Sequence, residues 1–149
     1  MARKFRRVDY EQSLEQTVTI GEVLPADHLA RFLAQVIVLL DLSDFYAQYA
    51  PVGGEPYAPE VLLGLLLYGY VMGVFSSRKI EQATHDSIPF RFLAGGWHPD
   101  HDTIATFRRV FLPHIVELFA QVLWVAHELG VLTLNDVSVD GSKIHADAS

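Results

Sequence analysis

One aspartate near the end of the chain has the surroundings of a divalent-metal ligand. Asp140 follows Val137 and Val139, which alternate with polar residues, and Gly141 comes directly after it. This period of two predicts a β-strand or hairpin that ends in a turn. A carboxylate held on a strand supplies the hard oxygen that Mg²⁺ prefers, and phosphodiester chemistry uses pairs of such ions. An ordinary Asp-Gly turn has the same sequence, so both interpretations stay open.

A second set of residues has the chemistry to contact a nucleic acid. Residues 76–112 hold five of the eleven Lys and Arg residues, together with four acids. Arginine and lysine contact phosphates, and the first residues of a recognition helix meet base edges. The candidate DNA-binding residues are Arg78, Lys79, Arg91, Thr103, Thr106, Arg108 and Arg109. A solvated helical face with local ion pairs, such as Arg78 with Glu81, is the alternative.

Two histidines lie among acids in a pattern that a metal site can also have. His98 and His101 flank Asp100, and Asp102 follows them. The spacing falls in an expected loop and no cysteine joins it, so a structural or surface role is favoured over zinc binding.

Composition indicates one domain, or one domain followed by a fragment. The chain has 149 residues, half of them apolar, which is enough for a packed core. It has no cysteine, which excludes disulfides and thiolate metal sites and favours a reducing cytoplasm. The net charge of −7 disfavours binding of nucleic acid over the whole surface. Phosphate contact must therefore be local, from residues 76–112 or from the basic lead at residues 3–7.

Apolar periodicity and turn signals predict the helices that position these residues. They are expected over 25–42, 45–49, 59–73, 77–86, 90–93, 103–112 and 113–129. The expected caps are Ser43 or Asp44, Ser76 or Ser77, and Asp102 or Thr103. Pro113 is expected to kink or restart the last helix. Two short helices, a glycine-containing loop and a capped helix are compatible with a helix-turn-helix-like reader of DNA.

The longest apolar run covers residues 61–75 and contains three glycines. A membrane span needs about 20 residues, so a buried core helix is favoured. A membrane helix is the alternative, because glycines also suit close helix packing in lipid.

Several stretches, in their order and spacing, resemble a known family. They are 57–70, continued by 76–81; then 92–96 and 99–108; and finally 139–149. Together they are similar to insertion-sequence transposases of the Asp-Asp-Glu class that have an InsH-like helical amino-terminal domain. The similarity spans residues 20–149.

The resemblance implies a DNA-transposition protein of the bacterial cytoplasm, associated with the nucleoid. Its partner would be DNA, the terminal inverted repeats of the element, and Asp140 would be the first acid of the catalytic triad. The complete enzyme would use Mg²⁺ or Mn²⁺ for DNA cleavage and recombination. The family's other two acids have no counterpart before Ser149. The chain is therefore expected to be truncated, inactive alone and without a metal of its own.

The expected fold is mainly α: a multi-helix orthogonal bundle with helix-turn-helix-like character, followed by a terminal β-strand or hairpin that begins a truncated ribonuclease-H-like domain. Residues 1–20 would form a basic and polar lead, 21–131 the helical transposase domain and 132–149 the start of the catalytic domain. The alternative function is a helical protein–protein interaction module. It would form a homo-oligomer through the apolar faces of 61–75 and 115–125, without DNA or a membrane.

Overall fold

The computed structural model describes residues 5, 19–48 and 56–130, and this part of the chain is mainly helical. Its helices are α1 (Ile20–Val23), α2 (Leu29–Leu39), α3 (Ser43–Ala47), α4 (Pro59–Met72), α5 (Ser77–Asp86), α6 (Ile88–Leu93) and α7 (His101–Glu128). The mainly α prediction is confirmed for this part. The expected strand, the start of a ribonuclease-H-like domain and most of the basic lead lie outside the described residues.

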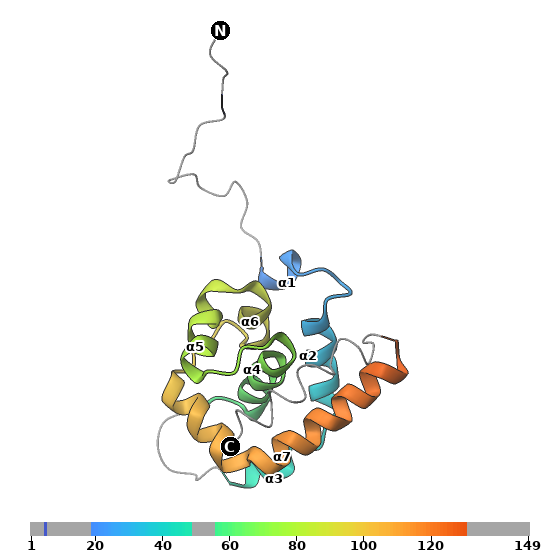
Figure 1. The fold of residues 1–149 in the computed structure, drawn as a ribbon, viewed down its shortest axis with the longest axis vertical. Helices are drawn as coiled ribbons and strands as arrows, with labels where there is room; N and C mark the ends of the chain where they lie inside the picture. Colours follow the sequence, from blue (N-terminus) through green and yellow to red (C-terminus); the bar gives the residue numbers. More distant parts are fainter. Residues whose placement is uncertain (1–4, 6–18, 49–55, 131–149) are drawn as a thin grey trace.

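Helix α4 forms the centre of the bundle (Figure 1). It begins at Pro59, whose fixed φ suits a first helical turn, and ends at Gly73, whose φ of 76° is left-handed. Leu63, Leu65 and Leu66 are fully buried on different sides of the helix, so its apolar run is covered all round. The predicted bounds of this helix and its role as a core helix are confirmed.

The other helices pack around α4. Helices α2, α6 and α7 each contact it, and α7 lies along one side of the molecule (Figure 1). Ile104 and Ile115 of α7 are fully buried in the shared core, and the tilted rings of Phe111 and Phe45 of α3 have centroids 4.7 Å apart. By length and hydropathy, α7 and the bent pair α4–α5 could cross a membrane. The α4 part of this pair is a buried core helix, and core helices pass the same test, whereas the α7 stretch is 28% buried.

The first long helix does not begin where its proline predicts. Residues 25–28 form a turn, in which the Pro25 carbonyl accepts from the His28 N–H at 3.1 Å. His28 then caps α2, because its Nδ1 accepts from the Ala30 N–H at 3.0 Å. Arg31 fixes this turn: its Nε donates to the Pro25 carbonyl at 2.9 Å, and its guanidinium lies 5.4 Å from the Phe92 ring. The expected range of 25–42 is therefore wrong at both ends.

The cap of α7 is also different from the expected one. Asp100, and neither Asp102 nor Thr103, is the N-cap: its Oδ1 accepts from the Thr103 N–H at 2.7 Å. Pro99 is buried and directly precedes it, and the helix begins two residues earlier than predicted. The helix then continues through Pro113 without a restart. Pro113 is exposed, while Phe111 and Ile115 on either side of it are buried in the core.

Two shorter helices begin earlier than expected. Helix α3 begins at Ser43 and its N-cap is Leu42, so Ser43 and Asp44 are not its caps. Helix α6 begins at Ile88, with Ser87 as the N-cap, rather than at Phe90. Helix α1 has only four residues and was not predicted.

Candidate nucleic-acid interface

A sharp corner joins α4 to α5. The chain changes direction by 98° between these helices, across a break of four residues or fewer. Gly73 makes the turn, and the Val74 N–H closes it by donating to the Gly69 carbonyl at 2.8 Å. Two helices at about 90–120° joined by a turn of three or four residues are the geometry of a helix-turn-helix unit. From the sequence, the helix expected to contact DNA bases was the one that begins near Thr103, at the start of α7. The structure has this geometry at α4–α5 instead.

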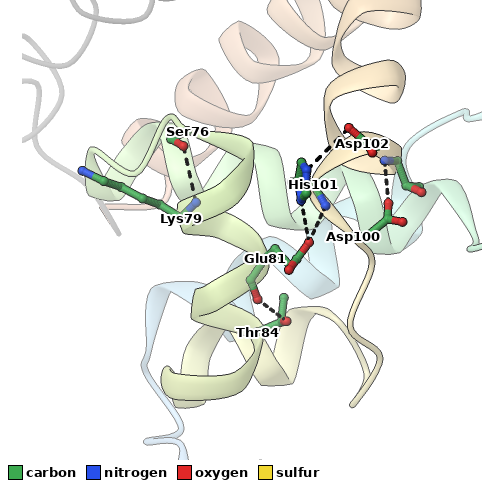
Figure 2. Close-up of polar contacts among 8 residues, drawn as sticks. Ser76, Lys79, Glu81, Thr84, Asp100, His101 and Asp102 are labelled. Carbon is green, nitrogen blue, oxygen red and sulfur yellow. Dashed lines mark hydrogen bonds and ion pairs between the residues drawn. The ribbon is translucent and has the colours of Figure 1, made fainter.

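Helix α5 presents a polar face next to this corner. Ser76 is its N-cap, with Oγ accepting from the Lys79 N–H at 3.4 Å (Figure 2). Ile80 and Thr84 are fully buried and anchor the opposite face. The exposed residues of the helix are Arg78, Lys79, Gln82, His85 and Asp86. The helix therefore carries two bases near its beginning, on the side away from the core.

A polar contact fixes α5 against α7. Glu81 Oε1 accepts from the His101 N–H at 2.6 Å and lies 3.1 Å from His101 Nδ1 (Figure 2). The backbone hydrogen bond from His101 is the main reason that the pKa of Glu81 lies below its usual value. The expected pairing of Arg78 with Glu81 is absent from the salt bridges of the described residues, because Glu81 is turned toward α7.

The histidines near this contact make structural interactions. His98 Nδ1 lies 3.1 Å from the buried Thr84 hydroxyl, and the His98 ring stacks on His85 with centroids 3.8 Å apart. Among residues 19–48 and 56–130, no group of three or more His, Cys, Asp or Glu side chains is placed to hold a metal ion.

Arg108 and Lys79 line the same cleft at the α4–α5 corner. The cleft has a volume of about 340 Å³, and Gly73, Phe75 and Ser76 complete its lining. Arg108 is half-buried and donates from Nη2 to the Phe75 carbonyl at 2.6 Å. Of the residues predicted to bind DNA, the structure brings these two together from separate helices.

The two threonines lie in a different environment. Thr103 and Thr106 line a mostly apolar hollow of about 430 Å³ with Leu62 and Phe107. Asp102, whose side chain is 87% exposed, lies beside them at the first turn of α7. A carboxylate there repels phosphate, which makes the beginning of α7 a poorer DNA contact than the α4–α5 corner.

The remaining predicted residues lie elsewhere on the surface or outside the described residues. Arg109 is exposed on α7, next to Arg108, and Arg91 is half-buried on α6. Asp140 lies outside the described residues. Sequence reasoning did not include Gly73, Ser76 or Phe75 in the site. The signal that could have found them was the glycine directly before a capped, basic helix.

These features describe a helical domain with a helix-turn-helix-like corner. The family described as Transposase domain (DUF772) matches residues 18–110, which include the corner and its cleft. Because the match covers more than half of the chain, the protein belongs to this transposase domain family. No curated protein and no solved structure matches the chain.

Proposed function

We propose that this helical domain is the DNA-binding part of an insertion-sequence transposase and that α5 is its reading helix. The observation that carries the proposal is the 98° turn from α4 into a capped, exposed and basic helix, in a chain of the transposase domain family. The ligand would be the terminal inverted repeats of the element. The transposase would be of the Asp-Asp-Glu class, with an InsH-like amino-terminal domain.

The side chains of α5 fit the chemistry of the major groove. Arg78 suits the two acceptors of guanine, and Gln82 suits the donor and acceptor of adenine. Gln82 now hydrogen-bonds Asp86 at 2.7 Å, a surface contact that a base edge can replace. Lys79 is exposed on the same helix and Arg109 is exposed on α7, and both suit phosphates. The acidic remainder of the chain would confine DNA contact to this face.

Asp140 would belong to the catalytic part of the complete enzyme, where Mg²⁺ or Mn²⁺ would activate water and stabilise the leaving oxygen. A single carboxylate does not hold a pair of metal ions, and the described residues offer no cluster to complete it. Cleavage of DNA by the complete transposase stays a proposal, as does its place in the bacterial cytoplasm.

The test is the affinity of the full chain for a duplex that carries the terminal repeat, measured by gel shift between about 50 and 200 mM salt. Binding should weaken steeply as salt rises, because each phosphate contact releases counterions. Arg78→Gln on α5 should lower the affinity, whereas Gln35→Glu, an exposed change on α2 with the same effect on net charge, should not. Equal effects of the two variants, or salt-independent binding, would refute the proposal. Arg108→Ala is unsuitable, because Arg108 also holds the Phe75 carbonyl.

A second candidate function is self-association, and exposed apolar side chains on α7 favour it. Trp124 is 64% exposed and Leu129 is 65% exposed, on the half of α7 that lies beyond the corner. The expectation that residues 61–75 also form such an interaction surface is wrong, because most of α4 is buried in the core. Sedimentation of the full chain and of Trp124→Ser distinguishes the two candidates. A Trp124-dependent dimer that binds no DNA would favour the interaction module.

A further inference from the structure

The cleft at the α4–α5 corner collects positive charge from two helices. Lys79 comes from the first turn of α5 and Arg108 from the middle of the first half of α7, and both side chains line the same hollow. Its volume of about 340 Å³ is several times the ~30 Å³ that one water occupies in the liquid, so it can admit a tetrahedral oxyanion. Among the residues that the structure describes, no carboxylate lines this cleft.

Arg108 is held in place before any ligand arrives. Its Nη2 donates to the Phe75 carbonyl at 2.6 Å, and its Cζ lies 6.0 Å from the centre of the Tyr70 ring. That is the only hydrogen bond of Arg108 among the described residues, and its Nε is buried without a partner. Since a guanidinium has five N–H donors, most of its donors are left for a ligand.

The nearby acids are Glu81 of α5 and Asp102 in the first turn of α7. Glu81 is engaged with His101, and the Lys79 side chain extends away from that contact (Figure 2). Asp102 precedes Arg108 by six residues, which is about 9 Å along a helix. The two bases are therefore separated from the carboxylates, and the positive end of the α5 dipole adds to their field.

We propose that this cleft seats one phosphate group of the DNA backbone, with Arg108 as the fixed donor and Lys79 as the mobile one. The inference rests on the proposed function for the source of the phosphate. By binding one particular phosphodiester linkage, the α4–α5 corner would fix the position of α5 along the DNA. Ser76 would present its hydroxyl at the rim of the same seat.

The test uses the full chain and duplexes in which one backbone linkage at a time is an uncharged methylphosphonate. At one linkage the wild type should lose affinity. Lys79→Gln should lose clearly less affinity at that linkage, because only Arg108 still contacts the phosphate there. Lys79→Gln should also lower the slope of log affinity against log salt by about 0.9. Arg78→Gln is the matched control, since Arg78 is exposed on the same helix but does not line the cleft. It should keep the full effect of that linkage.

A second measurement separates this inference from the proposed function. The NMR signal of Arg108 Nε–H should shift on titration with inorganic phosphate in the wild type and shift less in Lys79→Gln. DNA binding without any linkage coupled to Lys79, and without the phosphate-induced shift, would refute the cleft and leave the proposed function intact. Loss of all DNA binding, with the phosphate shift still present, would refute the proposed function and identify a site for free phosphate instead.

Discussion

At the scale of single residues, the contact between Glu81 and His101 determines how α5 lies against α7. The Glu81 carboxylate bonds both the backbone N–H and the ring of His101, at 2.6 and 3.1 Å. The Glu81 side chain thus positions α5 against α7. The contact also satisfies a backbone N–H at the beginning of α7, which has no partner within its own helix.

This contact predicts a pH-dependent stability. Because the pKa of Glu81 is lower in the folded chain than its ordinary value of 4.5, its stabilising effect is present above pH 4.5. The effect is lost as pH falls through the lower folded-state pKa. Glu81→Gln should therefore lower the Tm at pH 7, and the difference from the wild type should close as the solution becomes strongly acidic. Thermal unfolding followed by circular dichroism at several pH values measures this.

The control for this prediction is Glu117→Gln, which removes an exposed carboxylate from another part of α7. It should change the Tm little at either pH. If the difference in Tm between Glu81→Gln and the wild type is the same at pH 7 and in acid, the ionised carboxylate does not contribute to stability.

Arg108 shows why single residues of the site are hard to predict from the sequence. Its type and its place in a basic stretch indicated phosphate binding, and its partner in the cleft, Lys79, was in the same set. The sequence did not indicate the bond from Arg108 to the Phe75 carbonyl, because the two residues are 33 positions apart. Only the packing of α7 across the α4–α5 corner brings them together. The same holds for Glu81 and His101.

At the scale of elements, the corner after α4 depends on the glycine at position 69. A Cβ there would lie 2.5 Å from the Val74 carbonyl oxygen, which is backbone and cannot move aside freely. The close approach of the Val74 carbonyl to Gly69 lets the chain turn sharply into α5. The corner is therefore built by small residues on α4 as well as by the left-handed Gly73.

We predict that Gly69→Ala lowers the free energy of unfolding by about 1–3 kcal/mol, as overpacked sites do. Gly64→Ala on the same helix is the matched control. Its Cβ would lie 3.5 Å from Ile37 and Leu93 side chains, which is ordinary contact. Since alanine favours a helix over glycine by up to about 1 kcal/mol, this variant should be unchanged or more stable. Urea denaturation measures both; similar values for the two variants would contradict the proposed role of Gly69.

Helices with a continuous apolar pattern were predictable, whereas their beginnings were not. Helix α4 was predicted from its leucines, its opening proline and its closing glycine. For α2 and α7 the strongest local signals, Pro25 and Thr103, gave the wrong start. Other short-range contacts decided instead: Arg31 holds the turn before α2, and Asp100 rather than Asp102 caps α7. Several neighbouring residues in each stretch could have begun the helix, and the sequence alone did not decide among them.

At the scale of the whole molecule, the distribution of charge matters more than its total. The chain has a net charge of −7, yet Lys79 and Arg108 line one cleft, and Arg78 and Arg109 are exposed next to them in the sequence. An acidic protein with a local basic face should bind DNA in one orientation and at few places, because the rest of its surface repels phosphate. The match to the transposase domain family, over residues 18–110, covers all four of these bases.

The central claim is that α5 is the element that meets DNA. It is tested most directly by backbone amide chemical shifts of the full chain, recorded as a duplex with the terminal repeat is added. The largest shifts should fall on residues 76–86 and around Arg108 and Arg109, and a scrambled duplex should give smaller ones. Shifts confined to the second half of α7, or no shifts with the terminal repeat, would contradict the claim.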